Sequence, residues 1–147
     1  MPLTAMPGHL IRRLHQLSTA TFSEGMKAAG IDMTSVQFAA LQTIHDTPGI
    51  DQARLAHHIA YDRATIGGVV DRLERKGWVT RSINPEDKRA RQVALTGRGR
   101  AILRKAAPII SDLQSDILSG LSDAERAQFI ALANKAVGVE GGFDPSR

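Results

Sequence analysis

Residues 51–95 read DQARLAHHIAYDRATIGGVVDRLERKGWVTRSINPEDKRARQVAL. Asp51 is placed to cap a short helix whose apolar residues recur at helical spacing, and Asp62 is placed to cap a second one. Gly77 ends the second helix, because glycine readily adopts the left-handed conformation that closes a helix. The sequence therefore predicts two short helices that lie barely a turn apart.

The pattern changes after Gly77. Residues 78–83 and 91–95 alternate between apolar and polar side chains around the Pro-containing turn 84–87, which predicts a β-hairpin. Two short helices joined by a tight turn and followed by a basic hairpin form a winged helix-turn-helix. In that arrangement the second helix enters the major groove of DNA, and the hairpin reaches the backbone or the neighbouring minor groove.

The rest of the chain predicts four further helices. Apolar periodicity and capping patterns place them at residues 10–26, 34–45, 96–118 and 122–137. Pro108 lies inside the third of these helices, where it is either a point of flexure or a static kink.

We expect a mainly α fold in a single domain, residues 1–147. Residues 34–95 form a winged helix-turn-helix lobe with a small β-hairpin wing, and residues 139–147 form a loose tail. Residues 8–30 and 96–138 form a helical region from both chain ends. Because these helices carry more apolar surface than one small lobe can cover, we expect them to mediate dimerisation.

The composition narrows the possible functions. The chain has 147 residues, of which 42% are apolar and 23% are charged, and it contains no cysteine. A disulfide scaffold, a thiolate zinc site and a cysteine-based nucleophile or redox switch are therefore excluded. The sequence lacks the pattern of a signal peptide, and no apolar run reaches the ~20 residues that span a bilayer. We expect a cytoplasmic protein without a membrane partner.

Motifs typical of enzymes and cofactor sites are missing. His57 and His58 are neighbours on a helix and point ~100° apart, which is not the spacing of a two-histidine metal site. Gly97-Arg-Gly99 completes neither a dinucleotide fingerprint nor a P-loop, and nothing resembles a nucleophile elbow. We expect no metal, no cofactor and no enzymatic activity.

Positive charge is concentrated in the middle of the chain. Residues 51–105 contain 13 Lys and Arg against 6 Asp and Glu, a net charge of +7, whereas the whole chain carries +4. A basic segment indicates a polyanionic partner such as double-stranded DNA, although a merely solvated surface has the same composition. The helix-turn-helix pattern and the basic hairpin fall in the same segment, which favours DNA.

The second short helix carries the first group of DNA-binding candidates. Its apolar stripe is formed by Ile66, Val69, Val70 and Leu73. Its opposite side is formed by Ala64, Thr65, Gly67, Gly68, Asp71, Arg72 and Arg75. Adjacent glycines inside a helix each cost roughly 1 kcal/mol relative to Ala. Either the backbone approaches DNA closely at Gly67-Gly68, which we favour, or a neighbouring helix packs there.

The hairpin carries the second group of candidates. Lys88, Arg89 and Arg91 cluster at and just after its tip, where a guanidinium can enter a narrow minor groove. A charged hairpin tip by itself is more often simply solvated. DNA binding is favoured here because the basic hairpin occurs together with the helix-turn-helix pattern. The candidate DNA-binding residues are Arg63, Thr65, Gly67, Gly68, Arg72, Arg75, Lys88, Arg89 and Arg91.

The sequence contains Asp71-Arg-Leu-Glu with Lys76-Gly-Trp-Val and Arg81, the wing triplet Asp87-Lys-Arg89, and Leu95-Thr96 at the entry to a long helix. Together these motifs resemble the MarR family of bacterial transcription regulators. The resemblance implies a homodimer whose two winged lobes lie over successive major grooves of a pseudo-palindromic operator. It also implies that Arg89 enters the minor groove and that Asp87 braces it. Many members carry a polar or basic pair where this chain has Gly67-Gly68, so the base-reading pattern is not carried over.

The resemblance further implies a small-molecule signal, because members of the family often release DNA when a small aromatic acid binds between the dimer region and the winged lobe. His9, Arg12, Arg13 and Gln16 fall within two turns of the first helix at i,i+3 and i,i+4 spacing. Arginine can bind a carboxylate bidentately, and histidine can add a hydrogen bond. These four residues are the candidate ligand-binding site. The alternative is a solvated polar face beside the dimer seam.

The expected function is a sequence-specific DNA-binding transcriptional regulator, in particular a repressor released by a small aromatic carboxylic acid that resembles hydroxybenzoate or nicotinate. Other functions stay open. One is a DNA-binding regulator without a small-molecule ligand. From a different class come a protein-interaction scaffold that uses the basic wing and a small enzyme that uses the cleft between the lobes.

Overall fold

Helices form most of the molecule, whose computed structural model describes residues 1–59 and 63–138. In chain order the elements are the 3-10 helix η1 (Leu3–Ala5), α1 (Pro7–Ala29), α2 (Ser35–Asp46), α3 (Gln52–His58), α4 (Arg63–Arg75), β1 (Val79–Ile83), β2 (Arg91–Leu95), α5 (Gly97–Ile117) and α6 (Asp123–Ala136). Within these ranges no helix is both long enough and apolar enough to cross a bilayer. The predicted mainly α fold with a β-hairpin wing is confirmed.

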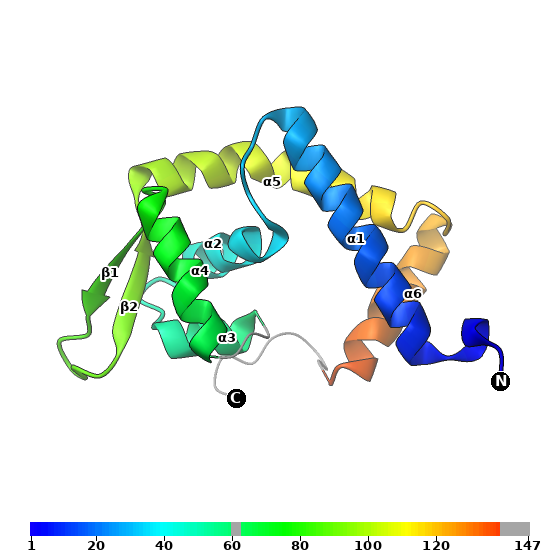
Figure 1. Cartoon of the computed structure of the whole chain (residues 1–147), viewed down its shortest axis with the longest axis horizontal. Helices are drawn as coiled ribbons and strands as arrows, with labels where there is room; N and C mark the ends of the chain where they lie inside the picture. Colours follow the sequence, from blue (N-terminus) through cyan, green and yellow to red (C-terminus); the bar gives the residue numbers. More distant parts are fainter. Residues whose placement is uncertain (60–62, 139–147) are drawn as a thin grey trace.

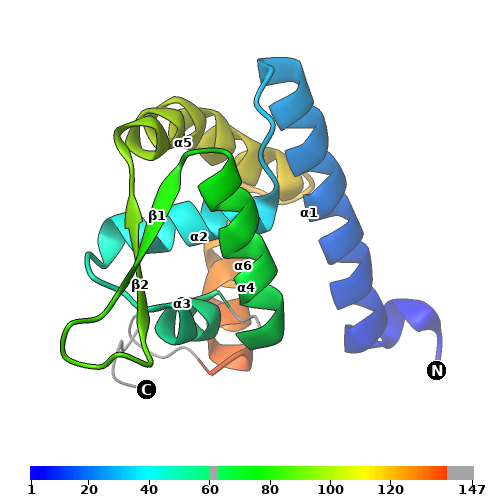
Figure 2. The same ribbon diagram turned by 60° about the vertical axis from the view of Figure 1, so that its left-hand side comes forward.

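The elements are arranged as an arch (Figure 1). α5 spans the top, the helices α2 to α4 and the hairpin lie together below its N-terminal end, and α1 and α6 extend from its other end. We call residues 35–95 the winged lobe. Figure 2 turns this lobe forward and shows α3 and α4 beside the hairpin, with α5 passing above α2.

The predicted helix caps are present. Thr34 and Gln37 make both hydrogen bonds of a capping box, at 3.1 and 3.2 Å. Ser122 and Glu125 form a second capping box, at 2.9 and 3.2 Å. The Asp51 carboxylate accepts a hydrogen bond of 2.8 Å from a backbone N–H in the first turn of α3. The helix starts therefore follow local side-chain chemistry.

Some boundaries differ from the prediction. α1 begins at Pro7 and not near residue 10, because the fixed φ of proline suits the first turn of a helix. α5 continues through Pro108, as predicted. The predicted cap Asp62 and the predicted tail 139–147 lie outside the described residues.

One apolar core runs through the winged lobe. Its most deeply buried side chains are Leu41, Ile50, Leu55, Ile66, Val70, Leu73, Val79 and Val93. Phe22 and Met26 of α1 and Leu103 and Ile110 of α5 belong to the same cluster. The predicted apolar stripe of α4 is thus confirmed, and burial of that stripe turns the opposite side of the helix outward.

The wing is fixed to the lobe at its base. β1 and β2 pair antiparallel, with Arg81 opposite Val93. The backbone N–H of Val93 donates a hydrogen bond of 3.0 Å to the carbonyl of Ile50, in the segment that leads into α3. This bond ties the hairpin to the helix-turn-helix unit, so the position of the wing depends on that of α3.

Gly99 allows close contact between the wing and α5. A Cβ added at Gly99 would lie 2.0 Å from the carbonyl oxygen of Trp78. Thr96 holds the same junction, because its hydroxyl donates to the carbonyl of Gly77 at 2.6 Å and its backbone N–H donates to the carbonyl of Trp78 at 3.0 Å. Gly99 is therefore required by packing.

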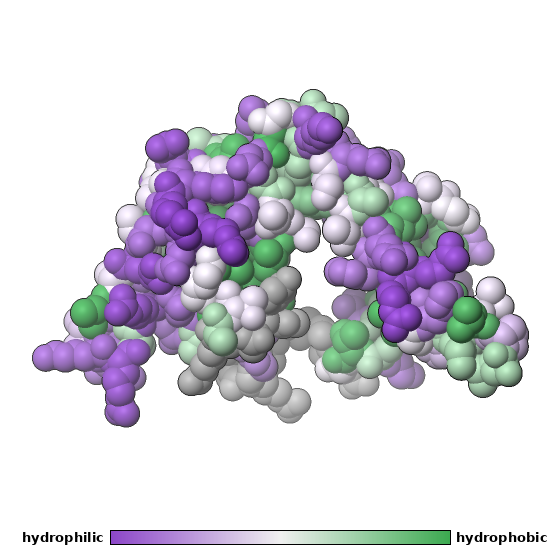
Figure 3. All heavy atoms as spheres, viewed as in Figure 1, coloured by the Kyte–Doolittle hydropathy of each residue, from purple (hydrophilic) through white to green (hydrophobic). Residues whose placement is uncertain are grey.

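Parts of α1 and α6 are left uncovered. Leu10, Ile11 and Leu17 of α1 are exposed, and α6 has no buried residue and exposes Ile130 and Leu132. Figure 3 shows apolar surface on this end of the arch and hydrophilic surface over most of the winged lobe. The apolar excess predicted for the two chain ends is confirmed.

Candidate nucleic-acid interface

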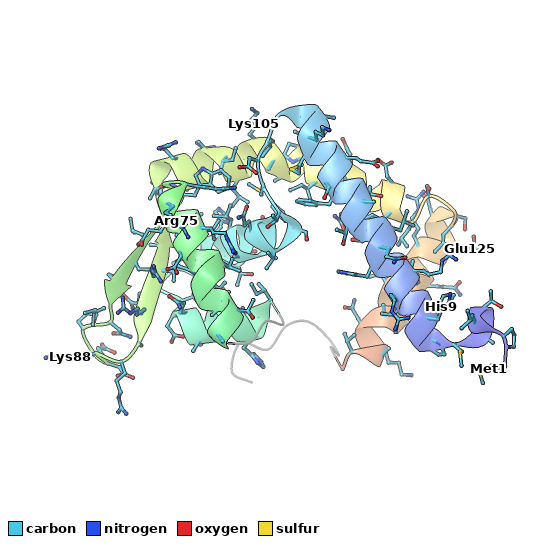
Figure 4. The ribbon with its side chains drawn as sticks, in the orientation of Figure 1. Met1, His9, Arg75, Lys88, Lys105 and Glu125 are labelled. Carbon is cyan, nitrogen blue, oxygen red and sulfur yellow. The ribbon has the colours of Figure 1, made fainter. Side chains whose placement is uncertain are left out.

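α4 turns one side into the core and the other side outward. Ala64 and Thr65 near its start, and Arg72 and Arg75 near its end, are exposed. Figure 4 labels Arg75 near the C-terminal end of the helix. Arg63 is the first residue of α4, and its side chain lies outside the described part of the structure. The outward side of α4 therefore carries small side chains near its N-terminal end and basic side chains near its C-terminal end, as the sequence predicts.

No packing contact within the described chain explains the glycine pair in α4. A Cβ at Gly67 would meet the amide nitrogen of Gln52 at 3.8 Å, and a Cβ at Gly68 would meet an Arg72 guanidinium nitrogen at 4.0 Å. Both distances are ordinary van der Waals contacts with ends of flexible side chains. Among the described residues, no neighbouring helix approaches the pair so closely that glycine is required there.

The cations on this side lack carboxylate partners. Arg72 and Arg75 take part in none of the ion pairs between described residues. Asp71, which helical spacing puts on the same side, is half-buried and forms an ion pair with Arg81 of β1. The outward side of α4 therefore keeps a net positive charge near its C-terminal end.

Arg81 joins three elements of the lobe. Its guanidinium forms ion pairs with Asp71 and, at 3.2 Å, with Glu74 of α4. It also donates a longer hydrogen bond of 3.4 Å to Gln52 of α3. The hydrogen bond to Glu74, followed by the one to Asp71, raises the pKa of Arg81 above its ordinary value, so the cation persists over the range in which the carboxylates are ionised.

The sequence prediction missed Arg81 as a residue that shapes the interface. A signal was available, because Asp71 and Glu74 are three residues apart and share one side of α4. A basic residue in the next strand is a natural partner for such a pair. The side chain of Arg81 is only 19% exposed and its guanidinium is engaged by two carboxylates, so it joins the wing to α4.

The wing tip presents the second group of cations. Figure 4 shows Lys88 projecting from the far end of the hairpin, and the side chain of Arg89 is 97% exposed. The Asp87 carboxylate accepts a hydrogen bond of 3.0 Å from the backbone N–H of Arg89 and lies 3.8 Å from its guanidinium. Asp87 therefore supports the tip, in agreement with the bracing role that was predicted for it.

A groove lies between the wing and the helix-turn-helix unit. It has a volume of about 550 Å³ and is lined by Asp51, Gln52, Ala53, Ile66, Asp87, Arg89, Ala90 and Arg91. Both carboxylates in this lining accept backbone hydrogen bonds, from Arg54 and from Arg89. The groove therefore brings Arg89 and Arg91 of the wing to the same side of the lobe as α3 and α4.

Lys76 shows that part of the basic segment is structural. Its Nζ donates hydrogen bonds to the carbonyl of Asp32 at 2.6 Å and to the side chain of Gln37 at 3.2 Å. It also lies 4.7 Å from the centroid of the Trp78 ring, which is a cation–π contact. Lys76 therefore links the C-terminal end of α4 to the loop between α1 and α2. Its charge does not add to the positive charge on the outward side of α4.

The comparison with known proteins identifies the family. A model of the MarR family matches residues 33–90. The transcriptional regulator HosA of Escherichia coli O111:H- is 35% identical over 127 residues, which cover 86% of this chain and 91% of HosA. The chain belongs to the MarR family. The predicted resemblance is thus confirmed, and this MarR-family protein is a DNA-binding transcriptional regulator.

Further similar proteins cover nearly the whole chain. The HTH-type transcriptional repressor NicR of Pseudomonas putida is 33% identical and covers 92% of this chain and 84% of NicR. The structure of Bordetella bronchiseptica BpsR, solved to explain regulation of its DNA binding by 6-hydroxynicotinic acid, matches with a TM-score of 0.87 and 28% identity, over 95% of this chain and 99% of BpsR. A mutant of MarR from E. coli in complex with operator DNA matches with a TM-score of 0.80 and 31% identity, over 88% and 91% of the two chains.

A hollow lies between α1, α2 and α5 of this MarR-family protein. Its volume is about 450 Å³, and its lining consists of Ser18, Phe22, Ser35, Phe38, Gln42, Ala107, Ile110, Ser111 and Gln114. Two aromatic rings and several hydroxyl and amide groups make a lining that suits a small ring with polar substituents. The sequence prediction contained none of these nine residues, because they come from three helices that only the fold brings together.

The α1 candidates do not line this hollow. His9 is half-buried and Arg12, Arg13 and Gln16 are exposed. Figure 4 shows His9 near the N-terminal end of α1, at the end of the arch away from the winged lobe. The four residues share one helix, as their spacing requires, but the single chain does not bring them to the lining of the hollow.

The described residues offer no cluster for a metal ion. Among them, no three His, Asp or Glu side chains come together in an arrangement that could hold one. His57 is exposed and His58 is half-buried. Burial, followed by the charges of Arg54 and His57, lowers the pKa of His58.

Proposed function

We propose that this MarR-family protein is a homodimeric repressor that binds a pseudo-palindromic operator and releases it when a small aromatic acid binds. The observation that carries the DNA-binding part is the convergence of cations on one side of the winged lobe. Arg72 and Arg75 of α4 and Lys88 and Arg91 of the wing have no carboxylate partner among the described residues. DNA phosphates can supply the missing partners.

α4 is the element that enters the major groove in this proposal. Thr65, Arg72 and Arg75 face the bases and the backbone, Arg63 lies at the entry of the helix, and Gly67 with Gly68 allows the backbone to come close to a base-pair edge. The wing reaches the neighbouring minor groove with Arg89, while Lys88 and Arg91 approach phosphates. The similarity to E. coli MarR complexed with operator DNA supports this docking.

A homodimer gives the two lobes a fixed spacing. The uncovered residues of α1 and the whole of α6 supply an apolar surface that one chain leaves in water. Pairing these surfaces buries them and sets two copies of α4 side by side, as a pseudo-palindrome requires, with half-sites about 34 Å apart. An isolated helix of α6's length is marginal in water, so a second chain also explains why α6 forms.

The aromatic acid occupies the hollow between α1, α2 and α5 in this proposal. BpsR, whose DNA binding is regulated by 6-hydroxynicotinic acid, and the repressor NicR are both similar to this chain, which supports an acid of the hydroxybenzoate or nicotinate class. His9, Arg12, Arg13 and Gln16 reach such a ligand from the partner chain of the dimer.

Release follows from a shift between two arrangements of the lobes. The hollow is bounded by α2, which belongs to the winged lobe, and by α1 and α5, which do not. A ligand that fits best when the lobes have the wrong spacing lowers DNA affinity by its differential affinity for that arrangement.

The test is fluorescence anisotropy of the protein on its own upstream DNA, measured over a range of salt concentrations with and without benzoate and pyridine carboxylates. We expect tight binding that weakens steeply with salt, because each phosphate contact releases counterions, and release by at least one acid. Binding that no acid disturbs would favour the regulator without a ligand. Equal affinity for unrelated DNA would contradict operator recognition and leave only the argument from the basic charge of the lobe.

Arg89 provides a direct test of the wing. We expect Arg89→Ala to weaken operator binding by about 1–3 kcal/mol, measured by the same anisotropy assay. Lys105→Ala is the control, because it also removes one positive charge. Lys105 lies on the top of α5, away from the wing (Figure 4). Equal affinities of the two variants would show that the wing does not contact DNA.

A further inference from the structure

Gln52 lies where α3, α4 and the wing meet. It is the first residue of α3 and is half-buried. Its side chain lines the groove between the wing and the helix-turn-helix unit, and Figure 2 shows α3 and α4 beside the hairpin. The DNA contacts proposed above do not include this residue.

The backbone of Gln52 is fixed by the second strand of the wing. The preceding residue, Asp51, forms an antiparallel bridge with Gln92 of β2, and the N–H of Val93 donates a hydrogen bond to the carbonyl of Ile50. The Asp51 carboxylate also caps α3. The side chain of Gln52 therefore starts from a fixed point at the boundary between the wing and α3.

The side chain of Gln52 is oriented by the first strand of the wing. Nη1 of Arg81 donates a hydrogen bond of 3.4 Å to Oε1 of Gln52, while Nη2 of the same guanidinium binds Asp71 and Glu74. A guanidinium has donors and no acceptor, so the amide oxygen of Gln52 has to face Arg81. The amide nitrogen therefore faces away from Arg81.

The amide nitrogen of Gln52 lies beside the glycine pair of α4. It is 3.8 Å from the position of a Cβ at Gly67, and it donates no hydrogen bond to any described residue. The backbone N–H groups of Gly67 and Gly68 follow the first four residues of α4, so they bond within the helix. The donor available beside Gly67 is therefore the Gln52 amide and not the helix backbone.

The middle of the outward side of α4 has no polar side chain at the glycine pair. The exposed residues Thr65 and Arg72 on either side of the pair are seven residues apart, which is roughly 10 Å along the helix axis. Nucleotides rise about 3.4 Å along each strand of DNA, so this stretch is as long as about three base-pair steps. Gln52 supplies a hydrogen-bonding side chain at this level, from α3.

We propose that Gln52 recognises a guanine in the major groove of the operator, as a hydrogen-bond donor that Arg81 holds in one orientation. This inference rests on the proposed docking of α4. A glutamine with both amide atoms free pairs with adenine, since it donates to N7 and accepts from the N6 amino group. Here Oε1 is engaged by Arg81, so the amide offers only its N–H donors. Guanine presents two neighbouring acceptors in the major groove, N7 and O6, and its edge matches such a donor.

The same geometry makes Arg81 a positioning residue for base recognition. Without the guanidinium, Oε1 of Gln52 is free to accept, and the amide can bind adenine through both of its polar atoms. Loss of Arg81 therefore changes which base is preferred, whereas loss of the Gln52 amide removes the preference. A residue that only stabilised the lobe would weaken binding to all sequences alike.

The base preference at every operator position tests this assignment. Footprinting locates the protected segment in the protein's own upstream DNA, and anisotropy then measures the affinity of the full chain for all single base-pair substitutions of that segment. The variants are Gln52→Ala and Arg81→Met, which removes every donor of the side chain. Gln92→Ala is the matched control, because Gln92 is a half-buried glutamine that does not line the groove. Its bridge to Asp51 is made by backbone atoms and persists in alanine.

We expect wild type to prefer guanine about tenfold over other bases at one position of each half-site. In Gln52→Ala this preference disappears while the preferences at other positions remain. In Arg81→Met the preferred base at the same position becomes adenine, and Gln92→Ala keeps the wild-type profile. Thermal unfolding of each variant checks that the lobe is folded, and partial unfolding does not change the preference at one position alone.

A uniform loss of affinity in Gln52→Ala would overturn the inference, because the amide then contacts a phosphate. An unchanged profile in Gln52→Ala also overturns it, since the amide then lies outside the DNA contact. Guanine preference retained in Arg81→Met contradicts the orienting role of Arg81. These results leave operator recognition intact. If wild type binds its upstream DNA no better than unrelated DNA, operator recognition itself fails, and this inference fails with it.

Discussion

Arg81 connects the wing and α4 through one guanidinium. It belongs to β1 of the wing, and its partners Asp71 and Glu74 belong to α4. Their side chains are 48% and 44% exposed, so solvent weakens each ion pair. The wing and α4 are nevertheless tied together where they meet, because one guanidinium nitrogen of Arg81, Nη2, binds both carboxylates.

Arg81→Gln therefore should weaken operator binding without removing a DNA contact. Charge-assisted hydrogen bonds contribute about 1.5–3 kcal/mol, and exposure of the partners reduces this to about 1–2 kcal/mol of unfolding free energy. Urea unfolding and operator anisotropy measure the two effects. Thr80→Gln, on the neighbouring exposed position of β1, is the control. A variant at Arg81 that is less stable but binds operator like wild type would contradict the positioning role.

Substitutions of the glycine pair in α4 should change the stability of the protein and its affinity for DNA in opposite directions. Gly67→Ala and Gly68→Ala add a methyl group that meets only the ends of flexible side chains, at 3.8 and 4.0 Å. Each should raise the free energy of unfolding by up to about 1 kcal/mol, because glycine is a poor helix former. If the backbone approaches a base-pair edge there, the same methyl groups should weaken operator binding at least about tenfold, or 1.4 kcal/mol. Thermal unfolding and anisotropy distinguish the two changes.

Gly8→Ala in α1 is the control for the glycine pair, since a Cβ there meets no atom within 4 Å. It should not affect operator affinity. Operator binding by both α4 variants at wild-type strength would mean that DNA does not approach the pair closely.

At the scale of elements, the junction between hairpin and α5 depends on Gly99. Gly99→Ala puts a methyl group 2.0 Å from the carbonyl oxygen of Trp78, so the backbone has to shift. Overpacking of this kind costs about 1–3 kcal/mol, and we expect a lower unfolding midpoint together with weaker operator binding. Gly97→Ala is the matched control two residues earlier, because its Cβ would meet only an Arg100 nitrogen at 3.9 Å. Equal midpoints for the two variants would exclude the tight contact.

The sequence predicts elements better than it predicts sites. Caps such as Thr34 and Ser122 are local, since the hydrogen bonds they make span three residues. The stripe of α4 follows from periodicity alone. The Arg81 ion pairs and the tight contact at Gly99 join residues 7 to 21 positions apart, and only the fold defines them. The hollow requires α1, α2 and α5 to meet, which no spacing along α1 alone can predict.

The two ends of the arch differ in how well their apolar side chains are buried. The winged lobe encloses its own core, whereas α6 buries none of its residues. By helical spacing, Phe129, Ile130, Leu132, Ala133 and Val137 share one broad side of α6, and Ala131 points away from it. That side, together with the exposed leucines of α1, is the surface through which two chains pair in the proposed dimer.

A charge on this side of α6 should therefore separate the chains without unfolding the lobe. We expect Ile130→Glu with Leu132→Glu to give monomers, because a carboxylate buried in an apolar interface is strongly unfavourable. Ala131→Glu should remain dimeric. Light scattering after size exclusion measures the mass, and circular dichroism checks the lobe. A monomer presents one copy of α4, so it should lose the affinity gained by binding two half-sites at once. A double variant that stays dimeric and binds the full operator like wild type would show that α6 is not part of the interface.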